Sequence, residues 1–168
     1  MNTESFSLSE PDTYDVNVMR INPLCPLAIQ TSKLNYKRDG DELILTFDPN
    51  KESTIKFYKQ FNKLNKDIWN KCDTNLRNKF PKTITDNMYC SPIKHSDNLL
   101  DYPTMRIEIP EGSDDDLQGE GIGVFLIALK YVHITPTSAV PKWFIPVGKY
   151  KKIVNYNYDD LVGSDNEE

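Results

Sequence analysis

The chain has 168 residues, of which 38% are hydrophobic and 27% are charged, and its formal net charge at pH 7 is -5. This length favours a single domain with flexible ends, and the apolar content is sufficient for a hydrophobic core. No run of about 18 apolar residues occurs, which excludes a transmembrane helix, and the acidic start MNTESFSLSEPDTYD lacks the apolar stretch of a signal peptide.

The first part of the chain predicts a flexible segment followed by a β-hairpin. Residues 1–20 are acidic and polar, and we expect them to be flexible. Residues 27–47 contain two stretches with strand character, LAIQTSKL and LILTF, separated by KRDGDE. Because Asp-Gly favours the positive φ angles of a tight turn, this segment is expected to form a hairpin.

One long amphipathic helix is expected at about residues 53–80. Apolar residues recur there at intervals of three or four, the spacing of one helical face. The opposite face is rich in lysine, which is the usual composition of a solvated helix face. The predicted buried residues are Phe57, Phe61, Leu64, Ile68, Cys72 and Leu76.

The remainder of the chain is predicted to be β-structure with an acidic loop. We expect strands in NMYCSPIK, TMRIEIP, VFLIALKYVHIT, KWFIPV and YKKIVNY. An acidic loop spans residues 111–121, and residues 156–168 form an acidic disordered tail. The fold class is therefore α+β, mostly β, with a single basic domain over residues 21–155 that forms a small barrel or a sandwich.

The charges are distributed unevenly along the chain. Residues 1–16, 111–120 and 159–168 hold 14 of the 25 acidic residues and none of the 20 basic residues. The rest of the chain therefore has a formal charge of +9. A basic body favours a polyanion such as nucleic acid as its partner, although acidic blocks in loops and ends are also typical of segments that are only solvated.

Sequence motifs give little support to an enzyme. GEGIG places glycines at three alternate positions, but a strand rather than a helix is expected after it, unlike in a dinucleotide-binding loop. The acids of SDDDLQGE are adjacent, unlike the alternating ligands of an EF-hand loop. Cys25, Cys72 and Cys90 form no CxxC motif. We therefore expect free thiols, no metal or other cofactor, and no catalytic activity.

Basic and aromatic residues are interleaved on several predicted strands. This combination suits single-stranded nucleic acid, because bases stack on aromatic rings while cations neutralise the phosphates. Tyrosine and tryptophan are also ordinary strand residues with half-buried rings, which is the alternative explanation. The candidate nucleic-acid-binding residues are Lys33, Tyr36, Lys37, Arg38, Tyr89, Lys94, Arg106, Lys130, Tyr131, Lys142, Trp143, Lys149, Tyr150, Lys151 and Lys152.

Four segments resemble the OB-fold single-stranded DNA-binding proteins of phages and large DNA viruses. They are PLAIQTSKLNY, DYPTMRIEIP, GVFLIALKYVHI and the tail YDDLVGSDNEE, about a third of the chain together. The resemblance implies a small OB-like barrel, and a tail that competes with DNA for the basic groove and recruits replication proteins. The tail residues to which this role would pass are Tyr156, Tyr158, Asp159, Asp160, Asp165, Glu167 and Glu168.

The sequence therefore favours a non-catalytic single-stranded DNA-binding protein of viral DNA replication or recombination, located inside the host cell in the cytoplasm or nucleus. RNA as the ligand and a homo-oligomeric state are left open. One alternative is a β-sandwich that serves protein interaction or the virion, with no nucleic-acid role. The other is a metal-dependent nuclease that uses the carboxylates of SDDD.

Overall fold

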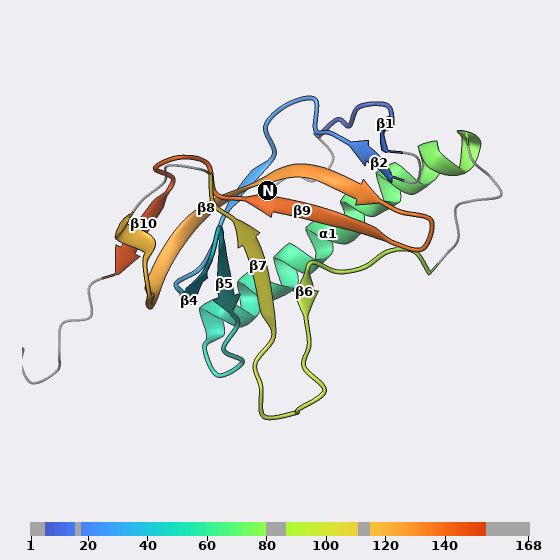
Figure 1. Ribbon diagram of the computed structural model, residues 1–168. Helices are drawn as coiled ribbons and strands as arrows, with labels where there is room; N and C mark the ends of the chain where they lie inside the picture. The colour runs from blue at the N-terminus through green and yellow to red at the C-terminus, as the bar shows by residue number, and fades with distance from the viewer. Residues whose placement is uncertain (1–5, 16–17, 80–86, 111–114, 154–168) are drawn as a thin grey trace, which may run out of the picture.

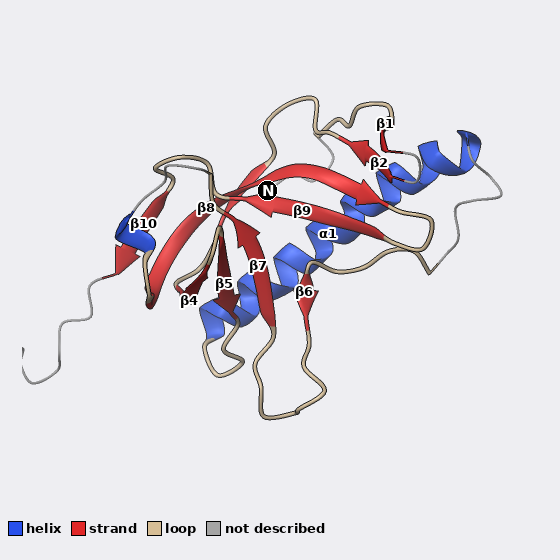
Figure 2. Ribbon diagram, viewed as in Figure 1, coloured by secondary structure: helices blue, strands red, loops and turns tan. Residues whose placement is uncertain are grey.

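The computed structural model describes residues 6–15, 18–79, 87–110 and 115–153 (Figure 1). Within them the fold is mostly β with one long helix, which confirms the predicted fold class at that level (Figure 2). The elements are β1 (Asp12–Asp15), β2 (Val18–Ile21), β3 (Ala28–Gln30), β4 (Leu34–Asp39), β5 (Glu42–Thr46), α1 (Glu52–Lys79), β6 (Ile93–Lys94), β7 (Thr104–Glu108), a 3-10 turn (Asp115–Leu117), β8 (Glu120–Ile134), β9 (Ala139–Phe144) and β10 (Tyr150–Ile153).

Five of the strands pair in a closed ring. β4 pairs with β5, β5 with β7, and β8 with both β4 and β9, all antiparallel. The predicted hairpin is the β4–β5 pair, and Gly40 supplies its turn with a φ of 61°. The ring closes where β7 and β9 meet in parallel at the Glu108–Phe144 pair, next to which the amide of Ile145 donates to the carbonyl of Glu108 at 3.0 Å.

The long strand β8 connects the ring to the other strands. Along one edge it pairs with β4, then β3, then β2, and along the other with β10 and then β9. β4 and β10 therefore flank the N-terminal half of β8, whereas β2 and β9 flank its C-terminal half. All the described strands belong to one continuous sheet.

Helix α1 begins and ends within one residue of the predicted limits, and it lies behind the ring (Figure 1). All six residues of the predicted apolar face are at most 4% exposed. Full burial of a side chain such as leucine contributes roughly 1.5–3 kcal/mol, so this face attaches the helix firmly to the sheet. Among the described residues, no helix is both long enough and apolar enough to cross a membrane.

The N-terminal segment differs from the prediction. β2 pairs with the C-terminal part of β8, and β1 pairs with β2. Phe6 is 8% exposed, and the ammonium group of Lys71 on α1 donates a hydrogen bond to its carbonyl at 2.7 Å. The described residues up to 20 therefore belong to the folded body rather than to a flexible arm. Their polar sequence did not indicate this, because short paired strands do not need apolar residues.

The predicted acidic loop at residues 111–121 is partly ordered structure. Leu117 in the 3-10 turn is fully buried, and β8 already begins at Glu120. Residues 111–114 and the predicted tail at 156–168 lie outside the described residues.

Candidate nucleic-acid interface

A groove of about 490 Å³ crosses the outer surface of the ring. It is bordered by β5, β6 and β7 on one side and by β8 and β9 on the other, so it lies across the short β7–β9 junction. The residues that line it are Glu42, Pro92, Lys94, Thr104, Arg106, Glu108, Tyr131, Val140, Pro141, Lys142 and Trp143.

Two lysines supply positive charge in this groove that no ion pair offsets. Lys94 on β6 and Lys142 on β9 are both exposed, and neither has a carboxylate within ion-pair distance among the described residues. Lys142 faces outward because its neighbours Pro141 and Trp143 are buried, and side chains alternate across a strand. These two ammonium groups are therefore available to contact phosphates.

The groove's arginine is held by carboxylates. Arg106 Nη1 lies 2.7 Å from an oxygen of Asp39 and 3.1 Å from one of Glu42. The hydrogen bonds to Asp39 and then to Glu42 raise the pKa of Arg106, so its charge is fixed at all working pH values. These exposed ion pairs are weakened by salt, and a phosphate could replace the carboxylates as partners of Arg106.

A β-bulge places the groove's aromatic ring. Between Leu129 and Tyr131 the pairing of β8 with β9 shifts, and the consecutive residues Lys130 and Tyr131 are both accessible. Lys130 binds both carboxylate oxygens of Glu108, at 2.7 and 2.8 Å. The guanidinium carbon of Arg20 lies 4.1 Å from the centre of the half-buried Tyr131 ring. The ring is therefore already part of a cationic stack, the setting in which a nucleobase also stacks.

The sequence analysis did not identify Arg20 and His133, which lie at the edge of the groove. The β2–β8 register pairs Arg20 with His133, beside Tyr131 and Lys142. Burial, and then the charges of Lys142 and Arg20, lower the pKa of His133. His133 is therefore neutral at pH 7. Its alternation with Tyr131 could have placed it on the same face, but Arg20 could be found only by knowing that β2 joins the sheet.

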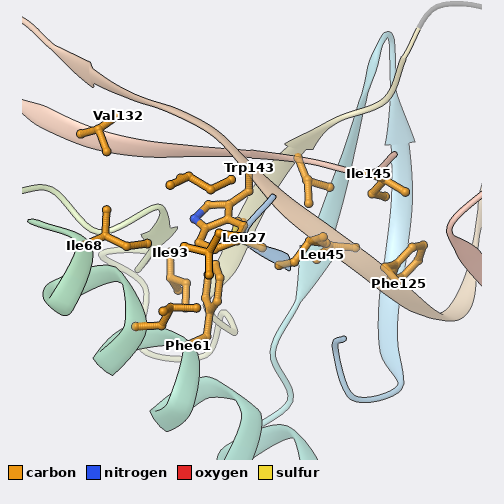
Figure 3. Packing of buried hydrophobic residues seen from close by; sticks show 14 of the residues in the cluster. Leu27, Leu45, Phe61, Ile68, Ile93, Phe125, Val132, Trp143 and Ile145 are labelled. Carbon is orange, nitrogen blue, oxygen red and sulfur yellow. The ribbon is translucent and has the colours of Figure 1, made fainter. Parts of the chain in front are cut away.

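The structure removes Trp143 from the stacking surface. The residue is 4% exposed, and its indole points from β9 toward Phe61 on α1, with ring centres 5.0 Å apart (Figure 3). Its Nε1 donates to the side-chain oxygen of the buried Asn65 at 2.8 Å. Trp143 thus forms the floor behind the groove and fastens α1 to β9, so its predicted contact with bases is wrong.

Tyr36 is also a core residue rather than a binding residue. It is 2% exposed and packs edge to face on Phe125, with ring centres 5.7 Å apart. Tyr36 pairs with Gly121 on β8. A Cβ atom at Gly121 would lie 2.9 Å from the Tyr36 hydroxyl oxygen. Gly121 and Gly123 of GEGIG therefore make room for aromatic rings, since a Cβ atom at Gly123 would lie 2.7 Å from the Phe125 ring.

Two other candidate tyrosines, Tyr89 and Tyr150, do not line the groove. Tyr89 stacks on Trp69 with ring centres 6.4 Å apart, and burial raises the pKa of Tyr89. Tyr150 packs against the core.

Four candidates with accessible side chains line the groove: Lys94, Arg106, Tyr131 and Lys142. Lys130 lies beside them. The others lie beside the N-terminal half of β8, near or on β4 and β10: Lys33, Lys37, Arg38, Lys149, Lys151 and Lys152.

The described residues show no donor set for a metal. They contain no group of three or more His, Cys, Asp and Glu side chains that could hold an ion, and the acids of SDDD lie partly outside them. Burial raises the pKa of Cys72 to about 12, so this thiol is a packed side chain of α1 rather than a nucleophile.

Comparison of the chain with models of known protein families, with curated protein sequences and with solved structures found no match in any of the three. The groove and its side chains are therefore the basis for a functional proposal.

Proposed function

We propose that this chain binds single-stranded nucleic acid, with DNA as the first candidate, along the groove and without catalysis. The observation that carries the proposal is the meeting in a single groove of an accessible ring, Tyr131, with Lys94 and Lys142, which form no ion pair with any residue that the structure describes. A base would stack on the ring while the neighbouring phosphates contact the lysines. Readers of duplex DNA instead insert an element into a groove of the duplex, and α1 uses its apolar face for packing against the sheet.

We also propose that the ring is an OB-like barrel. OB folds are five-stranded Greek-key barrels that bind oligonucleotides on their second and third strands, beside the loops that join strands one to two and four to five. The equivalent strands here are β5 and β7, and the loops are the turn at Gly40 and residues 135–138. Glu42 on β5 and Arg106 on β7 both line the groove, so it occupies the corresponding face.

The charge of the groove predicts strong salt dependence and moderate affinity. Counting only the residues that the structure describes, five cations and three carboxylates lie in or beside it, a formal charge of +2: Arg20, Lys94, Arg106, Lys130 and Lys142, with Asp39, Glu42 and Glu108. Each phosphate that replaces a carboxylate or a counterion releases that ion, so binding weakens as salt is added.

The acidic tail fits this proposal as a competitor. Residues 156–168 contain two tyrosines and five acids, with no lysine or arginine. Rings and negative charge are the two features that a single strand would offer to the groove. We propose that the tail occupies the groove in the absence of DNA and is free to contact replication proteins when DNA displaces it.

Titration of a fluorescent oligo-dT with the full chain at several salt concentrations tests the proposal. We expect binding at low salt and a linear fall of log K with log[salt]. Absence of binding at low salt, or a flat salt dependence, would refute it. An oligo-rU of the same length measures the preference for DNA over RNA, and a chain without residues 156–168 should bind more tightly if the tail competes.

A further inference from the structure

The β6–β7 loop exposes two adjacent leucines. Leu99 is 99% exposed and Leu100 is 85% exposed. The loop projects away from the sheet beyond β6 and β7 (Figure 1). Two neighbouring leucines displayed in this way are unusual on a monomeric protein and are typical of an interaction surface.

Hydrogen bonds hold this loop in shape. The Ser96 hydroxyl donates to the Asp101 carboxylate at 2.9 Å and accepts from the amide of Asn98 at 3.1 Å. The side-chain oxygen of Asn98 accepts from the amide of Leu100, also at 3.1 Å. The leucines are therefore presented by a preorganised loop, which lowers the entropy cost of docking them.

The charge of the loop favours a protein as its partner rather than nucleic acid. Asp97 and Asp101 flank the leucine pair, and two carboxylates would repel phosphates. A complementary surface would be apolar and bordered by basic residues.

The chain itself carries such a surface at the foot of the same loop. A second groove, of about 290 Å³, is lined mainly by apolar side chains from the segment between β5 and α1, the start of α1 and the residue before β7: Phe47, Pro49, Ile55, Tyr58 and Pro103. Lys59 also lines it, beside Asp48, and Lys56 is exposed on the same turn of α1.

The groove and the loop lie at one end of the molecule. The amide of Phe47 in the groove donates to the carbonyl of Pro103 at 2.9 Å, and Pro103 follows the leucine pair by three residues. Leu99 and Leu100 are exposed and are not among the residues that line this groove in their own chain.

We propose that two copies of the chain pair through these features, with Leu99 and Leu100 of each copy in the apolar groove of the other. Because the loop and the groove are neighbours, one two-fold axis satisfies both at once and gives a closed dimer. Asp97 and Asp101 beside the leucines then complement the charge of Lys59 in the groove lining. The two grooves share no lining residue, so the dimer can be tested separately from the function proposed above.

Sedimentation velocity of the full chain over a wide concentration range tests the pairing. We expect a concentration-dependent dimer, and Leu100→Ser or Ile55→Ser should each raise its dissociation constant at least about tenfold. Val147→Ser is the matched control, because Val147 is 69% exposed in the β9–β10 turn and takes no part in the interface. Circular dichroism checks that every variant remains folded.

A mixture of the two interface variants gives a second readout. Leu100→Ser keeps its groove and Ile55→Ser keeps its loop, so their heterodimer has one intact contact and should be more stable than either variant alone. The proposal is overturned if the chain stays monomeric up to about 1 mM, if Val147→Ser weakens the dimer as much as Leu100→Ser, or if the mixture gains nothing.

Discussion

Replacing Lys94 and Lys142 tests the proposal that nucleic acid binds in the groove. Both lysines are exposed, and within the described parts of the chain neither has a carboxylate at ion-pair distance. For single strands, each neutralised phosphate contributes about 0.7 to the slope of log K against log[salt]. In the double variant Lys94→Gln, Lys142→Gln this slope should therefore become shallower by about 1.4, and affinity near 0.05 M salt should fall by roughly 50–100-fold. Fluorescence anisotropy with labelled oligo-dT at four or more salt concentrations measures both quantities.

A matched variant separates the position of the charges from their number. Lys63 and Lys66 are exposed on α1, and Lys63 forms an ion pair with Asp67 at 3.6 Å. Lys63→Gln with Lys66→Gln removes the same charge from the helix and should leave the salt slope unchanged. If both double variants change the slope equally, binding depends on the overall charge of the body, and the assignment of the groove is refuted.

Three further predictions address the floor of the groove, its edge, and the burial of the cysteines. Trp143→Phe removes the hydrogen-bond donor to the buried side-chain oxygen of Asn65. It should lower the free energy of unfolding in urea by about 1–3 kcal/mol and leave the salt slope of DNA binding unchanged. An unchanged free energy of unfolding would contradict the role of this bond. Phosphates near His133 should offset the repulsion by Lys142 and Arg20 and so raise the pKa of His133. The protein should therefore take up a proton when it binds DNA, and its affinity should rise as the pH falls from about 7.5 to about 5.5. His133→Ala should remove this pH dependence. Maleimide should modify the exposed Cys25 in the native chain and the buried Cys72 only after unfolding, as followed by mass spectrometry.

Helical periodicity was the strongest predictor of structure in this sequence. The apolar residues of α1 repeat from Phe57 to Leu76, and this many matches to one face cannot arise from a strand. The strands β1 and β2 were not predicted, because four-residue strands in a polar segment carry no periodic signal. Their position depends on β8, more than 100 residues later in the chain.

The site was predicted only in part because strand geometry separates neighbouring residues. In a regular strand, consecutive side chains point to opposite faces of the sheet, so the ring next to an exposed lysine points into the protein. Lys142 is exposed and Trp143 is buried, and Lys37 is exposed and Tyr36 is buried. Tyr131 escapes this rule.

The bulge in β8 is the reason for that exception. It breaks the alternation after Leu129, so that Lys130 does not share the buried face of Val132 as a regular strand would require. Nothing in the sequence of β8 indicates where this extra residue lies. Tyr131 was one of the predicted binding residues, but only the strand register distinguishes its accessible ring from the buried rings of Tyr36 and Trp143.

Photochemical cross-linking tests the central claim most directly, because it reports both binding and its location. The full chain is irradiated at low salt with an oligo-dT that contains 5-iodouracil, and the modified peptide is identified by mass spectrometry. We predict a cross-link at Tyr131 that is lost in Tyr131→Ala and suppressed by added salt. Cross-links confined to α1, or none at saturating oligonucleotide, would contradict the proposal that this groove binds single strands.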